Sequence, residues 1–178
     1  MRVARFFIGE AMYDELTSVD IKKLEEEITY RKVTLAPVLM AEMKRTREFG
    51  DLSENAEYKE AKREKRKNES RIRYLKNMIR TAKVIDTSSN SDEVGIFDKV
   101  TLFMEDDNER EEYTLVTNIR VNVIEGRIST ESPVGKAIFG KHVGDRVSIN
   151  VNDNYTYTAI IEKIEKGTDD GSIPLKQY

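Results

Sequence analysis

The chain has 178 residues with 30 Lys and Arg against 33 Asp and Glu, so its net charge of −3 gives no overall attraction to nucleic acid. It has no cysteine and one histidine, His142, which excludes disulfides and thiolate zinc sites and argues against cysteine or histidine catalysis. No apolar stretch is long enough to span a membrane and residues 1–8 lack the pattern of a signal peptide, so the expected location is the cytoplasm.

The first predicted helix begins near Ser18, after an N-terminal extension of residues 1–15 that has no assignment. Its apolar residues recur at steps of three, four or seven, which is the spacing of one helix face: Ile21, Leu24, Ile28, Leu35, Leu39 and Met43. Thr17 or Ser18 can cap its start, and Asp20 in the first turn favours the helix dipole. Pro37 cannot donate a helical hydrogen bond and clashes one turn back, so we expect a kink or local distortion there.

A second predicted helix carries a heptad seam whose positions alternate steps of four and three. The seam residues are Glu54, Tyr58, Ala61, Lys65, Asn68, Ile72, Leu75, Ile79 and Ala82. The far half is apolar and should pack firmly, whereas Lys65 and Asn68 weaken the half nearer the turn but help to fix its register. Gly50 lies between the two stripes and tolerates the positive φ of a chain reversal. These features predict an antiparallel coiled-coil hairpin over residues 16–86, with its tip near 50–54 and a length of about 45 Å.

The C-terminal half has the alternation expected of β-strands. Residues 87–92 are rich in Ser, Asn and Asp and form the expected linker. Beyond them apolar and polar residues alternate with a period of two in three runs: 100–104, 147–151 and 155–159. Ser132 and Pro133 suit the start of a short helix and Gly140 suits its end. We expect a small β-rich domain over residues 93–166 and a mobile polar tail over 167–178, which makes the fold class α+β.

One string of residues is specific enough to indicate a family. Nine contiguous residues resemble the signature of the GreA/GreB transcript cleavage factors: Gly50-Asp51-Leu52-Ser53-Glu54-Asn55-Ala56-Glu57-Tyr58. The resemblance covers the chain from about residue 16 to 165. It includes Pro37, which resembles a family position that comes at the same place in the order of the motifs. Leu52 and Glu57 favour the GreA branch, while the basic run after Lys62 is similar to GreB, so the cleavage pattern of the two branches stays open.

The resemblance implies a protein that assists another enzyme and is not itself an enzyme. Gre factors insert the hairpin through the secondary channel of bacterial RNA polymerase when backtracking has extruded the nascent RNA 3′ end, and they stimulate the nuclease activity of the polymerase. By motif position, Asp51 and Glu54 are the acids that help to hold a second Mg²⁺. This incomplete site is expected to bind Mg²⁺ only in the complex, because the ion needs further oxygen ligands. The protein is expected to be a monomer without a tightly bound cofactor.

A simpler interpretation of the two acids is structural. An acid three residues before a glutamate, just ahead of an amphipathic helix, also matches a capping box in which each side chain binds a free amide. For an isolated pair this interpretation would be preferred, and the complete nine-residue string reverses the preference. Both roles can coexist, with Asp51 capping the helix and Glu54 the freer ligand.

Basic residues follow the tip on one helix and precede it on the other. Arg47, Lys62 and Arg63 are the candidates for contacts with the extruded RNA, whose phosphates attract cations in a salt-dependent way. The alternative is a solvated helix face with ion pairs between successive turns. Tyr58 and Phe49 can stack on a base, although packing in the seam is the better interpretation of Tyr58.

The C-terminal half resembles the FKBP-like domain of the family, which anchors Gre factors on the polymerase. Ile138 and Phe139 are candidate polymerase contacts, with core packing as the alternative. The resemblance also raises a remote prolyl isomerase or chaperone alternative, although no aromatic-lined pocket can be recovered from the sequence. The main rival is a Gre-like protein that blocks the secondary channel without promoting cleavage. A generic coiled-coil adaptor would explain the heptads but not the tip string.

Overall fold

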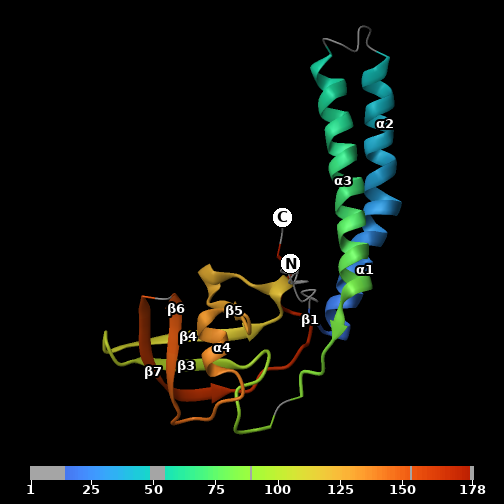
Figure 1. Ribbon diagram of the computed structural model, residues 1–178. Coiled ribbons are helices and arrows are strands. Elements are labelled where there is room, and N and C mark those ends of the chain that lie inside the picture. The colour runs from blue at the N-terminus through green and yellow to red at the C-terminus, as the bar shows by residue number, and fades with distance from the viewer. Residues whose placement is uncertain (1–14, 49–54, 89, 153, 177–178) are drawn as a thin grey trace, which may run out of the picture.

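The computed structural model describes residues 15–48, 55–88, 90–152 and 154–176, and it has a long helical hairpin standing on a β-rich part (Figure 1). One arm of the hairpin runs through α1 (Ser18–Tyr30), the π-helical turn η1 (Arg31–Leu35) and α2 (Ala36–Arg47). The other arm is α3 (Ala56–Thr81). The α+β fold class predicted from the sequence, with an antiparallel hairpin followed by a β-rich half, is confirmed.

The first helix begins where the sequence predicts. Thr17 adopts an extended backbone and its hydroxyl accepts a hydrogen bond from the Asp20 amide at 3.0 Å, while the Thr17 amide donates to the Asp20 carboxylate at 3.2 Å. This reciprocal pair is a capping box and satisfies two free amides of the first turn. Below it, β1 (Glu15–Leu16) pairs in parallel with β2 (Lys83–Val84), so the two ends of the hairpin are joined at its base.

The distortion expected at Pro37 takes the form of the π-helical turn η1. The Ala36 amide donates to the carbonyl of Arg31, five residues back, and the wider turn accommodates the proline that cannot donate one residue later. Asn68 of α3 faces this turn, where its amide nitrogen donates to the Arg31 carbonyl at 3.2 Å and its oxygen accepts from the Arg31 guanidinium at 3.2 Å. The polar seam residue Asn68 therefore forms hydrogen bonds with the irregular turn η1 of the opposite arm.

The two arms pack along the predicted seam. In α3, the seam positions from Tyr58 to Ala82 are all buried or half-buried, and Lys65 turns its ammonium group to Glu69 of its own helix at 2.6 Å. The apolar core of the hairpin lies at its base, as the distribution of apolar seam residues predicts. The buried members of that core are Leu16, Leu24, Ile28, Leu75, Met78 and, from the β-rich part, Ile119.

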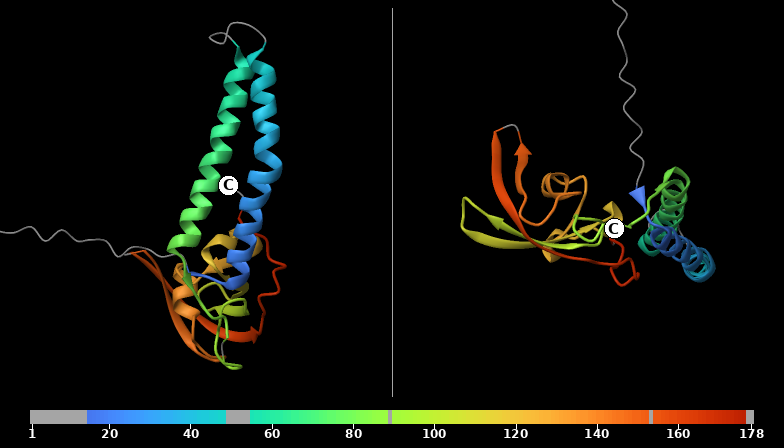
Figure 2. Two further views of the ribbon diagram at one scale, coloured as in Figure 1. Left: turned by 90° about the vertical axis from the view of Figure 1, so that its right-hand side faces the viewer. Right: turned by 90° about the horizontal axis from the view of Figure 1, so that it is seen from below.

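The β-rich part is a five-stranded sheet in the order β5-β4-β3-β7-β6. Its strands are β3 (Lys99–Met104), β4 (Glu109–Val116), β5 (Arg127–Ser129), β6 (Arg146–Asn152) and β7 (Tyr155–Glu165). Only β4 and β5 are parallel; the other neighbours are antiparallel. The short turns η2 (Asn118–Arg120) and η3 (Val123–Glu125) lie between β4 and β5. The sheet curves around α4 (Pro133–Ile138), which Figure 2 shows nearly end-on inside the curve.

The short helix α4 confirms the expected start and end signals. The Ser132 hydroxyl accepts from the Gly135 amide at 3.0 Å, Pro133 is the first helical residue, and Gly140 has a φ of 71° just beyond the helix. Ile138 has no exposed surface and packs with the core residues of β3, β6 and β7. The expectation that Ile138 contacts a polymerase is therefore wrong, because its side chain fills the core of the sheet.

The C-terminal tail is not the mobile segment that its polar composition predicts. The Lys23 ammonium of α1 donates to the carbonyl of Ile173 at 2.8 Å, and the Lys176 amide donates to the carbonyl of Ile119 at 2.7 Å. Leu175 packs against the apolar core at the hairpin base. These contacts hold the described tail residues against both α1 and η2, so the tail joins the hairpin to the β-rich part (Figure 1).

Candidate functional site at the hairpin end

The ends of α2 and α3 that flank the predicted tip lie at the end of the hairpin that is remote from the sheet (Figure 1). Asp51 and Glu54, together with Phe49 and Gly50, lie outside the described residues. The structure does describe the frame on either side of them, namely the last turns of α2 and the first turns of α3. With 26 residues, α3 extends for about 39 Å at 1.5 Å per residue, so the frame lies far from the β-rich part.

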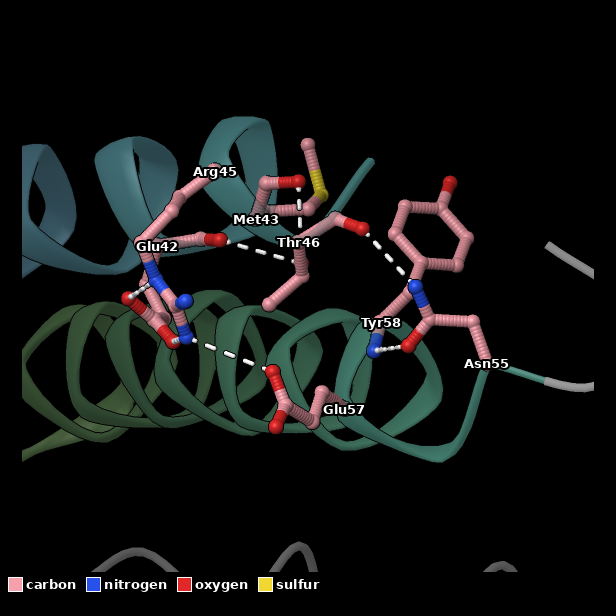
Figure 3. A network of polar contacts seen from close by, with 7 residues as sticks. All are labelled: Glu42, Met43, Arg45, Thr46, Asn55, Glu57 and Tyr58. Atoms are coloured by element: carbon pink, nitrogen blue, oxygen red, sulfur yellow. Dashed lines mark hydrogen bonds and ion pairs between the residues drawn. The ribbon is translucent and has the colours of Figure 1, made fainter. Parts of the chain in front are cut away.

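Asn55 connects the two helix ends, as Figure 3 shows. Its side-chain oxygen accepts from the Tyr58 amide at 2.9 Å and so caps α3, while its side-chain nitrogen donates to the Thr46 carbonyl in the last turn of α2 at 2.8 Å. One amide side chain therefore satisfies an orphan donor of one helix and an orphan acceptor of the other. The link fixes the separation of the two points from which the tip loop starts and ends.

Thr46 and Arg45 strengthen this frame. Thr46 is fully buried between the arms, and its hydroxyl donates to the carbonyl of Glu42 at 3.0 Å. The Arg45 guanidinium binds both oxygens of Glu42, at 3.0 and 2.6 Å, and contacts Glu57 of α3 at 3.4 Å (Figure 3). Hydrogen bonding to Arg45 lowers the pKa of the Glu42 carboxyl below its ordinary value. Glu42 therefore stays ionised, and Arg45 bridges the arms.

Asn55 also decides the capping question. The sequence allowed Asp51 to cap the second helix, but the N-cap residue of α3 is Asn55, with extended backbone angles and its side chain on the Tyr58 amide. The capping interpretation of the tip acids is therefore wrong for the start of α3. The N-cap role at the start of α3 belongs to Asn55, and Asp51 and Glu54, which lie outside the described residues, stay candidates for a ligand. The preference for Asn at N-caps was a signal in the sequence that could have identified this role.

Cations gather on one face of α3 behind the tip. They line a shallow groove with Ser70: Lys59, Lys62, Arg63, Arg66 and Lys67. Arg63 lies 3.5 Å from Glu60, and Lys67 is paired with Glu64. Within the described part of the chain, Lys59 and Lys62 form no ion pair with a carboxylate, although Lys62 lies 5.9 Å from the centre of the Tyr58 ring. The face thus keeps a net positive charge despite its ion pairs.

The structure brings two of the three predicted RNA contacts together. Lys62 and Arg63 share the groove, whereas Arg47 is the exposed last residue of α2 and does not line it. Tyr58 is half-buried, which favours its packing role over base stacking. On the β-rich part, Phe139 is 48% exposed and remains a candidate contact. In the described ranges, no three His, Cys, Asp or Glu residues are placed to hold a metal ion, and no helix there could cross a membrane.

Comparison with known proteins places this architecture in a family. The chain matches "Transcription elongation factor, N-terminal" over residues 15–84 and "Transcription elongation factor, GreA/GreB, C-term" over residues 88–166. The chain belongs to the GreA/GreB family. The two matches divide this GreA/GreB protein between the hairpin and the sheet, and the docked tail after residue 166 lies beyond both.

Individual GreA/GreB proteins agree with this assignment. Transcription elongation factor GreA of Caldanaerobacter subterraneus subsp. tengcongensis is 43% identical over 148 residues, which are 83% of this chain and 94% of that protein. GreA of Bacillus subtilis is 39% identical over 134 residues, 75% of this chain and 85% of that protein. Solved structures that match include GreA factor homolog 1 of Thermus thermophilus, at 24% identity and a TM-score of 0.38 over 86% of this chain and 99% of that one.

Proposed function

We propose that this chain inserts its hairpin into the secondary channel of bacterial RNA polymerase and stimulates cleavage of backtracked RNA. The main support is the frame made by Asn55, which ties the end of α2 to the start of α3, the two helix ends between which Asp51 and Glu54 lie in the sequence. A rigid frame matters because a catalytic group displaced by about 1 Å can lose a hundredfold in rate. The protein acts in this proposal as an activator, while the polymerase performs the chemistry.

The chemistry of the two carboxylates fits the metal that the proposal requires. Asp51 and Glu54 supply hard oxygen ligands, which Mg²⁺ prefers, and they leave room for water and phosphate ligands. When bound, the ion would stabilise charge on the oxygens of the phosphodiester that is cleaved. Two carboxylates alone make an incomplete site, so the ion is expected to be shared with the polymerase and lost when the proteins separate.

The basic face of α3 has a supporting role. Lys62 and Arg63 follow the tip by two turns and lie in a groove with three further cations. A flexible RNA 3′ segment carries one negative phosphate per nucleotide, so this face would attract it and release counterions. We expect the groove to hold the extruded RNA near the tip and to contribute affinity, without taking part in bond cleavage.

The experiment that tests the proposal uses a defined elongation complex halted in a backtracked state. The protein is added with Mg²⁺, and release of short RNA fragments from the 3′ end is followed together with binding to the complex. Accelerated release of fragments supports the proposal. The rival function is a channel blocker, and it predicts binding that slows nucleotide addition with no fragments released. Absence of any binding would contradict both.

A further inference from the structure

A second hollow lies in the β-rich part, at the end of the sheet formed by the β3–β4 and β6–β7 hairpins. It has a volume of about 270 Å³, and its lining residues come much later in the sequence than the hairpin tip. Its lining residues are Met104, Asp106, Asp107, Glu111, Tyr113, Tyr155, Tyr157 and Thr158. No aromatic-lined pocket can be recovered from the sequence, whereas the structure has this hollow with three tyrosines. The three tyrosines come from two separate strands that only the sheet brings together.

The floor of the hollow is aromatic. Met104 is buried, Tyr113 and Tyr157 are half-buried, and Tyr155 is exposed with its ring centre 5.8 Å from that of Tyr157. The Tyr113 hydroxyl donates to the Glu111 carboxylate. Burial, and next the neighbouring Glu111 carboxylate, raise the pKa of Tyr113 and of Tyr157 above the ordinary value. The phenols therefore stay neutral at physiological pH and offer their π-faces to a ligand.

The charges of the hollow are all negative. Asp106, Asp107 and Glu111 are exposed at its edge, and no Lys or Arg of the described residues belongs to the lining. Among the described residues, none of these three carboxylates has an ion pair with a cation. The hollow therefore holds three negative charges beside aromatic faces, without internal compensation.

The opposite face of the same strand is different. Glu112 follows Glu111 on β4 and points to the other side of the sheet, where it pairs with Lys99 at 2.7 Å. Arg110, which precedes Glu111, likewise pairs with Glu162 at 2.7 Å. Carboxylates and cations balance on that face, so the uncompensated charge is a local property of the hollow.

We propose that this hollow binds an arginine side chain presented by a partner protein. A guanidinium group is planar and weakly hydrated, so it can stack on Tyr155 or Tyr157 while its N–H groups donate to the carboxylates of Glu111 and Asp106. A hollow of about 270 Å³ is at the small end for a ligand site and suits one side chain. The inference is independent of the proposed cleavage function, because it concerns other residues in another part of the molecule.

Other occupants fit the hollow less well. A bare metal ion would need at least three converging oxygen, nitrogen or sulfur ligands, and no such group occurs among the described residues. A proline ring, the substrate of the remote isomerase alternative, is neutral and gains nothing from three carboxylates at the edge. A lysine side chain could enter, but its compact, strongly hydrated ammonium stacks less favourably than a guanidinium.

The test follows the amide signals of Met104, Tyr113 and Tyr157 by NMR while the full chain is titrated with a short Gly-Arg-Gly peptide. The matched probe is Gly-citrulline-Gly, which has nearly the same shape but no charge. We expect saturable shifts with the arginine peptide and at least about fivefold weaker binding of the citrulline peptide. Equal responses to the two peptides, or no shift up to about 10 mM of either, would overturn the proposal.

Two adjacent substitutions on β4 provide the control. Glu111→Gln removes a charge from the hollow and should weaken binding of the arginine peptide about fivefold. Glu112→Gln removes the same charge from the other face of the sheet and should leave the affinity for the peptide unchanged. Tyr155→Leu, at an exposed position, should weaken binding by removing a π-face. Equal effects of the two glutamine substitutions would mean that only net charge matters and would overturn the site.

Discussion

The Arg120 guanidinium of η2 contacts the Asp20 carboxylate of α1 at 2.5 Å, although the two residues are 100 positions apart in the chain. Both side chains are almost completely buried where the hairpin meets the β-rich part. Arg120 also lies 2.8 Å from Asp169 of the tail and 4.9 Å from the centre of the Phe97 ring. Because Asp20 closes the cap of α1, this cluster couples the start of the hairpin to the sheet and the tail.

Arg120→Met is therefore expected to destabilise the protein strongly. Removal of the cation leaves two carboxylates in an interior from which water is excluded, and breaking a buried pair in this way costs about 3–5 kcal/mol. Urea unfolding, followed by circular dichroism, measures the loss. The control is Arg110→Met, which breaks an exposed pair with Glu162 and should cost less than about 1 kcal/mol. Similar losses for the two variants would contradict a structural role of the buried cluster.

The ion pairs of Glu27 predict that the stability of the hairpin depends on pH. Burial raises the pKa of its carboxyl, but hydrogen bonds from Arg71 and Arg31 outweigh burial, so the pKa lies below the ordinary value of 4.5. A lowered pKa in the folded state means that the carboxylate adds stability above about pH 4.5. That contribution shrinks as the pH falls below this value and is gone below the folded-state pKa.

The direction of this pH dependence is tested by comparing the stability of Glu27→Gln with that of the native chain. The variant should be less stable by about 1 kcal/mol near pH 7, and the difference should disappear on acidification. Exposed Glu26, the residue before Glu27 in α1, gives the control, because Glu26→Gln should change stability little at either pH. A difference that grows as the pH is lowered would show that Glu27 is not stabilised by its two arginines.

Asn55→Ala tests the frame of the hairpin tip. The variant loses both the cap of α3 and the link to the Thr46 carbonyl, which together are worth about 1–2 kcal/mol. Hydrogen exchange of the Tyr58 amide should become faster, because this amide loses its acceptor. Asn77→Ala, at an exposed position of the same helix, should leave that amide unchanged. Unchanged protection of Tyr58 in Asn55→Ala would show that the link does not exist in solution.

The basic groove predicts a salt-dependent effect. Lys62→Gln combined with Arg63→Gln should slow cleavage of a backtracked complex at limiting protein concentration. It should also reduce the salt dependence of binding, by about 0.7 in the logarithmic slope for each lost contact with a single-stranded phosphate. Lys76→Gln with Arg73→Gln removes the same charge nearer the base of α3 and should have little effect. An identical salt slope for the two double variants would exclude RNA contacts in the groove.

The sequence predicts the local parts of this molecule well. The seam from Tyr58 to Ala82 follows from a 3.5-residue period, and the short helix after Ser132 follows from its capping residue and proline. Long-range contacts are different, because no periodicity connects Asp20 with Arg120 or predicts that a polar tail will bind both. The tail was expected to be mobile on its composition alone, while its few apolar residues, such as Leu175, decide its position.

The candidate site was also predictable only in part. The acids at the tip are recognised by their string, but the role of Asn55 depends on the distance between two helix ends that the sequence does not specify. Ile138 and Phe139 are neighbouring large apolar residues, and only the packing of α4 shows that the first is buried and the second half exposed. The negative hollow needs Tyr113 and Tyr157 from two strands, so no single segment predicts it.

The measurement that tests the central claim most directly is cleavage of backtracked RNA by polymerase with the native chain and with the Asp51→Asn, Glu54→Gln double variant. The variant should fold and bind the polymerase as the native chain does, since Asn55 and not these acids caps α3. We expect its stimulation of cleavage to be abolished, because the carboxylate ligands of the shared Mg²⁺ are gone. A double variant that stimulates cleavage as strongly as the native chain would contradict the proposed function of the tip.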